Sequence, residues 1–305
     1  MNKSLTIIFL VFVWYNGHAQ VTMQKADGGL LFIENNQKIL FYQTEPKNLN
    51  GEYERCNYIH PLWADDGTIL TEDFPSDHLH QRGIFWAWHQ IFINGQRIGD
   101  GWEIKNFEQE VVEVEYSQKK EGSAVLNTKV YWKSDLWEKE GEEVPYIQEN
   151  TTITIHPKTG NYRRIDFVIR LLALEEHVEI GGSEDEKGYG GFSVRMILPA
   201  DVSFSGPDGK VVPQNEAVQS PGYINISGSM LKNGKYGGIA IVDHRENPGF
   251  PQPWILRAKN SMQNAVYPGN KTVSVSLKEP LILKYSLLVY LGKMGQKRIQ
   301  RIQQY

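Results

Sequence analysis

The clearest structural pattern in the chain lies at residues 164–172, which read Arg164-Ile165-Asp166-Phe167-Val168-Ile169-Arg170-Leu171-Leu172. The odd-numbered positions are all apolar, and charged residues occupy three of the even-numbered positions. Successive side chains of a β-strand point to opposite faces of a sheet. The alternation therefore predicts a strand with one buried face and one face in contact with water.

Further strand signals lie on both sides of this segment. Asn35-Asn36 separates apolar runs at 30–33 and 39–42, and Asn94-Gly95 follows an aromatic-rich run at 84–93. Asn and Gly tolerate the left-handed backbone that two-residue hairpin turns require, so both pairs predict tight turns. The remaining predicted strands lie at 111–116, 125–132, 147–155, 192–198, 236–242, 254–257, 273–277 and 281–290.

Helical signals are sparse, and the best one is a thin apolar stripe of Ile299 and Ile302 within 294–303. No internal repeat or low-complexity linker interrupts the series of strands. A dozen or more strands without a linker favour an all-β fold. We expect one large antiparallel β-sandwich over residues 20–305, with the supersandwich as its extended variant, and a short C-terminal helix. Two domains divided near residue 120 are the alternative.

The first 19 residues resemble a secretory signal peptide. Lys3 supplies a positive charge, an apolar run occupies 5–15, and Gly17-His18-Ala19 provides small residues for cleavage. The apolar run is too short to span a bilayer, which requires about 20 residues. We therefore expect residues 1–19 to direct export to the periplasm or the medium, without insertion of the chain into the membrane.

Composition excludes some partners. The chain has 32 Lys and Arg against 36 Asp and Glu, which gives a formal net charge of −4. Nucleic-acid-binding domains present a basic surface, so nucleic acid is not an expected partner. The single cysteine, Cys56, cannot form a disulfide within the chain, and we interpret it as a small buried residue.

A pair of histidines lies in the segment Asp77-His78-Leu79-His80-Gln81-Arg82-Gly83. In extended backbone the side chains of His78 and His80 would point the same way. Such a pair can transfer protons or bind a metal. A metal site would need a third ligand from His89, His244 or a distant carboxylate. The alternative is that both are ordinary loop histidines that hydrogen-bond to their surroundings.

A second segment is acidic and rich in glycine. It runs from Glu184 to Gly191 and precedes Arg195 on a predicted strand. One interpretation is an active-site loop that presents Lys187 and Tyr189, while Arg195 binds an anion. Arginine suits that task because its planar fork donates to two oxygens of a carboxylate at once. The alternative is a solvated loop with glycine turns.

A third segment begins after the predicted strand at 238–242 and reads Asp243-His244-Arg245-Glu246-Asn247-Pro248. His244 is therefore expected at a strand end, where side chains can enter a cleft. Trp254 follows, and its flat ring with a polar edge suits a sugar ring. Packing in the core is the alternative for Trp254.

In this order the motifs resemble one bacterial family of exported proteins, catalogued as "methane oxygenase PmoA-like". The resemblance spans roughly residues 57–292. Its label implies nothing about methane or copper, because a membrane methane monooxygenase subunit has several transmembrane helices and this sequence contains no apolar run long enough for one. Where the family commonly reads His-x-His-His-Arg-Gly, this chain has Gln81 in place of the third histidine, which weakens a three-histidine metal cluster. The residues that carry the resemblance are 77–83, Trp86-Ala87-Trp88, Asn94-Gly95, Trp102, 187–196, Gly237-Gly238, Asp243-His244, Asn247-Pro248, Pro253-Trp254 and Asn264.

The resemblance implies a carbohydrate setting. Proteins of this kind look like companions of polysaccharide-degrading enzymes, and some relatives are linked to uronate-containing oligosaccharides such as ulvan fragments. An oligosaccharide dehydratase activity is associated with that setting. The implied function is therefore a hydro-lyase that eliminates water from the non-reducing terminal uronate of an oligosaccharide.

Such a reaction needs a base for the proton beside the carboxylate, cations for the developing charge and an acid for the departing hydroxyl. We expect His80 or His244 to be the base and Arg195 to bind the carboxylate. Two possibilities stay open: a reaction that uses a divalent metal bound by His78 and His80, and a reaction without any cofactor. The candidate catalytic residues are His78, His80, Tyr189 and His244, and the candidate substrate-binding residues are Arg82, Lys187, Arg195, Asn247 and Trp254.

Two other functions stay open at this point. A glycoside hydrolase would need two carboxylic acids beside the scissile bond, for which Glu184, Glu186 and Asp243 are available. A non-catalytic sugar-binding sandwich would use the aromatic residues and an arginine without the histidines. The sequence gives no indication of the oligomeric state.

Overall fold

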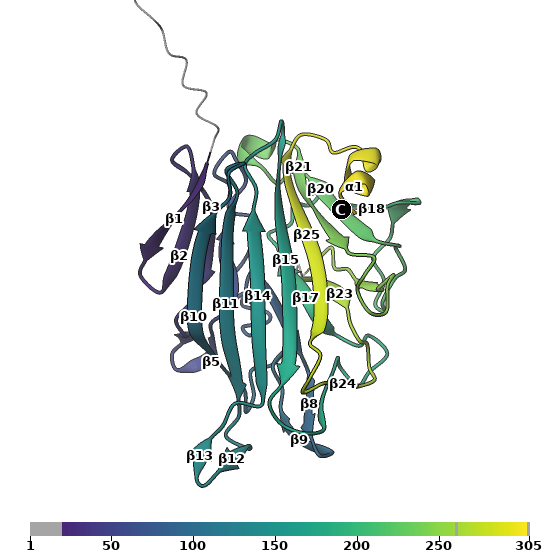
Figure 1. Cartoon of the computed structure of the whole chain (residues 1–305). Helices are drawn as coiled ribbons and strands as arrows, with labels where there is room; N and C mark the ends of the chain where they lie inside the picture. Colours follow the sequence, from purple (N-terminus) through teal and green to yellow (C-terminus); the bar gives the residue numbers. More distant parts are fainter. Residues whose placement is uncertain (1–19, 260–261, 304–305) are drawn as a thin grey trace, which may run out of the picture.

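Two large antiparallel sheets make up most of the protein (Figure 1). The computed structural model describes residues 20–259 and 262–303, so the predicted signal peptide at 1–19 lies outside the described residues. The all-β, sandwich-like fold with a short C-terminal helix is confirmed, and the helix is α1 (Gln296–Gln303). None of the helices among the described residues combines the length and the apolar character needed to cross a bilayer.

The nine-stranded sheet lies at the front of Figure 1. Its strands in spatial order are β10 (Glu108–Gln118), β11 (Ala124–Lys133), β14 (Ile147–Ile155), β15 (Tyr162–Ala173), β25 (Leu281–Leu291), β21 (Gly237–Asp243), β20 (Tyr223–Gly228), β18 (Ser203–Gly206) and β19 (Gly209–Val211).

The eight-stranded sheet forms the second layer. Its strands in spatial order are β1 (Val21–Ala26), β2 (Gly29–Glu34), β3 (Gln37–Gln43), β6 (Tyr58–Leu62), β7 (Ile84–Trp88), β17 (Gly190–Arg195), β23 (Met262–Val266) and β22 (Trp254–Ile255).

Smaller elements are attached to this frame. A four-stranded sheet has the order β24 (Val273–Val275), β16 (Val178–Gly181), β8 (Gln90–Ile93) and β9 (Gln96–Gly99). Two hairpins and a short 3₁₀-helix complete the described elements: β4 (Lys47–Leu49) with β5 (Glu52–Arg55), β12 (Glu138–Lys139) with β13 (Glu142–Glu143), and η1 (Lys232–Gly234).

Aromatic side chains join the two large sheets. Trp86 on β7 packs edge-on against Phe167 on β15, with ring centroids 6.3 Å apart. Phe192 on β17 stacks on Tyr285 on β25 at 4.7 Å. Each ring buries a large apolar area, and such burial is the main favourable term in folding. The predicted strand at 164–172 lies within β15, and its apolar positions point into this core.

A buried carboxylate crosses the same interface. Glu149 on β14 has no exposed surface, and it accepts hydrogen bonds from Trp86 Nε1 at 2.8 Å, Trp132 Nε1 at 3.1 Å and Asn57 Nδ2 at 2.8 Å. Burial raises the pKa of the Glu149 carboxyl, and the donors oppose that rise. The hydrogen bond that Trp86 donates to Glu149 lies on the core side of β7, so it fixes which face of β7 points into the core.

The Asn-rich turns are confirmed, and one predicted strand is divided. Asn35 and Asn36 both have positive φ, at 49° and 62°, and they connect β2 to β3. The run at 84–93, expected as one strand, forms β7 and β8, which belong to different sheets. The break lies at His89, where the Trp88 carbonyl accepts hydrogen bonds from the backbone N–H groups of Gly101 and Trp102. The loop that contains Gly101 and Trp102 therefore occupies the hydrogen-bonding position at which β7 would otherwise continue.

Strand β7 is buried on both faces, which explains its uninterrupted apolar sequence. Trp86 and Trp88 belong to the core between the two sheets. Phe85 and Ala87 point to the opposite face, where Trp102 covers them. The outer face of the eight-stranded sheet is therefore closed by loops, and these loops carry some of the predicted site residues, among them His78, His80 and Tyr189.

Candidate functional site

A dense group of functional side chains lies on the outer face of the eight-stranded sheet. Phe85 on β7 packs against Trp102, with ring centroids 5.3 Å apart, and Tyr189 contacts the same indole at 5.6 Å. We call the surrounding group the outer-face cluster; it consists of Arg55, His78, His80, Phe85, His89, Trp102, Glu103, Tyr189 and Arg257.

Asp100 fixes the loop that carries Trp102. Its Oδ1 accepts hydrogen bonds from the backbone N–H groups of Trp102 at 3.0 Å and Glu103 at 2.8 Å. Its Oδ2 lies 2.9 Å from Nδ1 of His89, and the His89 ring stacks on Trp102 at 5.4 Å. Since Trp102 is covered on that face, it anchors the loop and does not offer a free surface for stacking.

His80 is the buried histidine of the predicted pair. Its residue surface is 8% exposed, and no hydrogen bond to either ring nitrogen is formed within the described residues. The pKa of His80 is lowered to about 3, mainly by burial and in smaller part by the nearby His78 and Arg55. His80 is therefore uncharged at neutral pH. One ring nitrogen of a neutral imidazole is a free acceptor, as a general base requires.

His78 and His80 meet, but the backbone between them is not extended. The rings contact edge-on at 5.8 Å. Hydrogen bonds from His78 N to Pro75 O and from Gln81 N to His78 O form two successive turns, and these turns bring the rings together. His78 is the more exposed of the two, and its Nδ1 lies 3.0 Å from Oδ2 of Asp77.

Glu103 is the nearest carboxylate to His80. Its Oε2 lies 3.7 Å from Nδ1 of His80, beyond hydrogen-bond distance but close enough to attract a protonated ring. The next residue, Ile104, has φ of 59°, in the left-handed region that β-branched residues avoid. Backbone held in such a conformation is concentrated at functional sites, so the strain supports a functional role for this loop.

Arg195 does not serve as a free carboxylate clamp. It is 3% exposed, and its guanidinium donates to Glu72 Oε2, Gln81 Oε1 and Asp77 Oδ1, each at 2.8 Å. Two of these partners belong to the segment that carries His78 and His80. Arg195 therefore holds the histidine loop in place and has its own charge satisfied by the protein.

Arg82 is also a structural residue. It has no exposed surface, forms an ion pair with Asp73, and donates to Tyr58 Oη at 2.6 Å and to the carbonyl oxygens of Lys47 and Tyr53. These contacts use the guanidinium inside the protein. The prediction that Arg82 binds substrate is therefore not supported by its position.

Tyr189 belongs to the outer-face cluster, and Lys187 does not. The Tyr189 hydroxyl accepts a hydrogen bond of 2.6 Å from Arg257 Nη2. A phenol that accepts in this way keeps its own proton for donation elsewhere. Lys187 lies on the acidic loop, 3.4 Å from Asp185, and contributes no recorded contact to the cluster.

The third predicted segment lies apart from the cluster. His244 follows β21 in the other large sheet, and its ring Nδ1 accepts from the backbone N–H of Glu246. Asn247 is buried and donates to Asp243 Oδ1 and the Lys284 carbonyl, which makes it a structural bridge. Trp254 has no exposed surface, so it packs in the core and cannot stack on a sugar.

Asp243 gives a prediction about stability. Burial raises the pKa of Asp243 to about 6, above an unfolded value of about 3.9. The folded state therefore binds this proton more tightly than the unfolded state does. The resulting stabilisation of the folded state is fully present below about pH 4 and is lost as the pH rises through about 6. Between pH 4 and 7 we expect wild-type protein to lose about 2 kcal/mol of unfolding free energy relative to Asp243→Asn. Urea denaturation at several pH values measures this difference, and parallel curves for the two proteins would contradict it.

A metal site receives no support from geometry. Within residues 20–259 and 262–303, no three His, Cys, Asp or Glu side chains converge as metal ligands. Gln81 directs its amide oxygen to Arg195. Cys56 is buried, its Sγ lies 3.0 Å from the Gln109 carbonyl, and burial raises the pKa of its thiol to about 12. It is therefore not a reactive thiolate.

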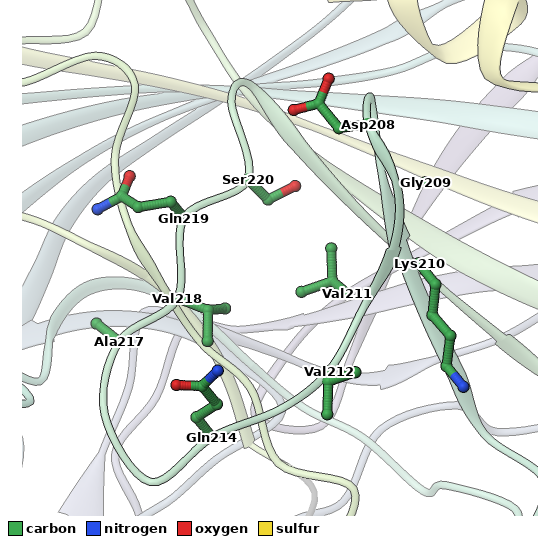
Figure 2. Close-up of a pocket in the computed structure, with 10 residues that line it drawn as sticks. All are labelled: Asp208, Gly209, Lys210, Val211, Val212, Gln214, Ala217, Val218, Gln219 and Ser220. Atoms are coloured by element: carbon green, nitrogen blue, oxygen red, sulfur yellow. The ribbon is translucent and has the colours of Figure 1, made fainter.

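A pocket of about 560 Å³ opens beside the outer-face cluster and is lined in part by Arg55, Glu103 and Ile104. A second pocket, of about 380 Å³, lies between the β18–β19 hairpin and the loop at 214–220 (Figure 2). The only charged residues lining the second pocket are Asp208 and Lys210. The first pocket is lined by Tyr53 and the buried Arg55, whereas the second is lined by no tyrosine and no buried charge. The first pocket is therefore the better candidate for chemistry.

Three cluster residues were not predicted from the sequence: Arg55, Glu103 and Arg257. Arg55 follows an ordinary run of charged residues at the end of β5, and nothing in that run distinguishes a buried arginine from exposed ones. The tight turn at Asn94-Gly95 and the nearby Trp102 are the only signals that point toward Glu103. Arg257 comes to Tyr189 from an irregular segment after β22.

Comparison with known proteins places the chain in a family. No curated protein matches it. A family model described as a family of unknown function, DUF6807, matches residues 32–304, which is most of the chain and includes every residue of the outer-face cluster. The chain therefore belongs to the DUF6807 family.

Proposed function

We propose that this protein is a hydro-lyase that eliminates water from the terminal uronate of an oligosaccharide, with His80 as the base. The observation that carries the proposal is a buried, uncharged histidine, free of hydrogen bonds within the described residues, that lies 3.7 Å from Glu103. The resemblance to the exported PmoA-like family supports the choice of substrate. In this proposal the protein is exported and acts on uronate-containing oligosaccharides in the periplasm or the medium.

The proposed reaction is a balanced elimination. His80 takes the proton from the carbon beside the carboxylate, and the electron pair of that C–H bond becomes the new C=C bond. The C–O bond on the neighbouring carbon breaks, and Tyr189 gives its proton to the departing hydroxyl, which leaves as water. Tyr189 can donate because its oxygen already accepts from Arg257. The proton on His80 then returns to Tyr189 through solvent.

The low basicity of His80 is compatible with this role. A pKa of about 3 belongs to the unliganded site, where positive neighbours and burial oppose protonation. A bound carboxylate adds a negative charge beside the ring and raises the pKa of the imidazole. Glu103 acts in the same direction. Binding of substrate therefore increases the basicity of His80 when the base is needed.

Glycoside hydrolysis has less support. Asp243 is fully buried beneath Asn247 and Gln252. Glu184 and Glu186 are both exposed on the surface loop, and Glu184 is paired with Arg97, 3.1 Å away. A glycosidase needs two carboxylic acids facing one bond. The candidates named from the sequence do not provide such a pair.

The products of the reaction test the proposal. Purified protein is incubated with a uronate-ended oligosaccharide and with its carboxyl-reduced analogue, each with and without a chelator. We expect the uronate-ended compound to lose one water and gain the ultraviolet absorbance of a conjugated C=C bond, while the reduced analogue stays unchanged. A shorter oligosaccharide would indicate hydrolysis, and an unchanged uronate compound would favour sugar binding; either result would overturn the proposal. Loss of activity with chelator would show that a metal participates.

The pH dependence follows from the pKa of His80. Because that pKa lies near 3, the free enzyme keeps His80 neutral throughout the range above pH 5. The pH dependence of kcat/KM reports the ionisation of groups in the free enzyme. We therefore expect that ionisation of His80 causes no decrease of kcat/KM with an apparent pKa between 5 and 7. Rate measurements between pH 4.5 and 8 in wild type and in His78→Gln check this expectation. A fall near pH 6.5 that persists in His78→Gln would contradict it.

A further inference from the structure

Four arginines are buried among the described residues: Arg55, Arg82, Arg163 and Arg195. Three of them form ion pairs with carboxylates. Arg82 pairs with Asp73, Arg163 with Glu34 and Asp65, and Arg195 with Glu72 and Asp77. Arg55 forms no ion pair with any described residue, although it is only 3% exposed.

The contacts of Arg55 leave part of its guanidinium unused. Nη2 donates to the Gly101 carbonyl at 2.5 Å, and the guanidinium carbon lies 5.1 Å from the Phe85 ring centroid. Nε is buried and has no hydrogen-bond partner. A buried donor without a partner costs free energy, and a buried charge without a counter-charge costs more. An anion from outside the chain would remove both costs.

The pocket beside Arg55 is rich in carboxylates. Arg55, Lys105 and Phe107 line it together with Glu52, Glu54, Glu103, Glu108, Asp135 and Glu143. Carboxylates at the wall repel a bare anion but accept hydrogen bonds from hydroxyl groups. The combination of one unpaired buried cation with several hydroxyl acceptors suits a ligand that carries one carboxylate on a hydroxyl-rich body.

We infer that Arg55 is the anion-binding residue of this site and that it binds the carboxylate of a hydroxylated acid through its unused guanidinium donors. The inference rests on the proposed function in one respect, which is the identification of this ligand as the substrate. Glu103 lines the same pocket and lies 3.7 Å from His80, so a carboxylate on Arg55 is held next to the proposed base. Arg55 thereby takes the role that the sequence assigned to Arg195.

Melting temperatures with sodium glucuronate as the probe test this inference. For wild-type protein we expect Tm to rise with glucuronate concentration and to stay unchanged with glucose at the same concentrations. Arg55→Met is expected to raise Tm without ligand by about 2–4 °C, because it replaces an unpaired buried charge with an apolar side chain, and to abolish the response to glucuronate. Acetate, which lacks hydroxyl groups, is expected to give a weaker response than glucuronate.

Two control variants carry the same substitution. Arg170→Met removes a charge on β15, where Arg170 hydrogen-bonds to Thr152, and it is expected to keep the glucuronate response. Arg163→Met removes a paired buried arginine and is expected to lower Tm, opposite in sign to Arg55→Met. An Arg55→Met protein that responds to glucuronate like wild type, or that melts well below wild type, would overturn the inference.

Kinetics separate this inference from the proposed function. With a uronate-ended substrate, Arg55→Met is expected to raise KM at least tenfold, as expected for loss of a charge-assisted contact. Glucuronate binding that depends on Arg55, without loss of water from any substrate, would support the anion site and remove the proposed reaction. If Arg55→Met still eliminated water from the substrate with an unchanged KM, the proposed reaction would be supported and the anion-binding role of Arg55 would be removed.

Discussion

Replacing His80 with glutamine is expected to lower kcat/KM for water elimination by about 10²–10⁴-fold, the usual contribution of a positioned general base. Glutamine is polar and similar in length, but it cannot accept a proton at neutral pH. The His80 ring forms no hydrogen bond within the described residues, so its replacement breaks none of the hydrogen bonds that hold the loop. We therefore expect Tm to change by no more than about 2 °C. The ultraviolet absorbance of the product gives the rate, and a melting curve gives Tm.

A matched histidine provides the control. His177 lies in the turn before β16 and is exposed. His177→Gln is expected to retain wild-type kcat/KM. If His80→Gln retained at least half of the wild-type kcat/KM while His177→Gln behaved as expected, His80 would not be the base.

Replacing Arg82 with methionine is expected to lower the free energy of unfolding by about 3–5 kcal/mol, the usual cost of breaking a buried ion pair from one side. The change would leave Asp73 without its main partner and Tyr58 Oη without its 2.6 Å donor. It would also remove the donors to the carbonyl groups of Lys47 and Tyr53, which lie on the two strands of the β4–β5 hairpin. Urea denaturation of wild type and variant measures the difference.

This result separates a structural arginine from a substrate clamp. Arg170→Met, which removes an arginine from the polar face of β15, is expected to change the free energy of unfolding by about 0.5 kcal/mol or less. A variant Arg82→Met that is as stable as Arg170→Met but has a greatly raised KM would contradict the structural role. The original assignment of Arg82 to substrate binding would then be restored.

The fold was predictable because its signals are local. The alternation at 164–172 and the Asn35-Asn36 and Asn94-Gly95 turns depend on backbone preferences that a short segment expresses by itself. The division of 84–93 was not predictable, because it depends on Gly101 and Trp102 bonding to the Trp88 carbonyl from another loop. The pattern of apolar residues is the same for one buried strand and for two.

The site was predicted in part. His78, His80 and Tyr189 come from two separate motifs, and the structure brings both motifs to one face because β7 and β17 are neighbours in the eight-stranded sheet. His244 also follows a strand, but that strand belongs to the other sheet. A sequence shows that a residue ends a strand; it does not show which layer the strand joins.

The arginines were the least predictable residues. Arg82 and Arg195 lie in recognisable motifs, yet both are neutralised by carboxylates of the protein. Arg55 lies in no conspicuous motif, and among the buried arginines of the described residues it is the one without an ion-pair partner. Pairing of charges over long sequence separations depends on the tertiary structure, so the sequence pattern favoured arginines whose charges the protein itself satisfies.

The most direct test of the account follows one hydrogen atom. A uronate-ended oligosaccharide carrying deuterium on the carbon beside the carboxylate is incubated with the wild-type protein in ordinary water, and the mass of the product is measured. If His80 removes that atom during elimination, the product loses HDO and retains no label. A product that loses H₂O and keeps the deuterium, or a substrate whose mass does not change, would contradict the proposed elimination.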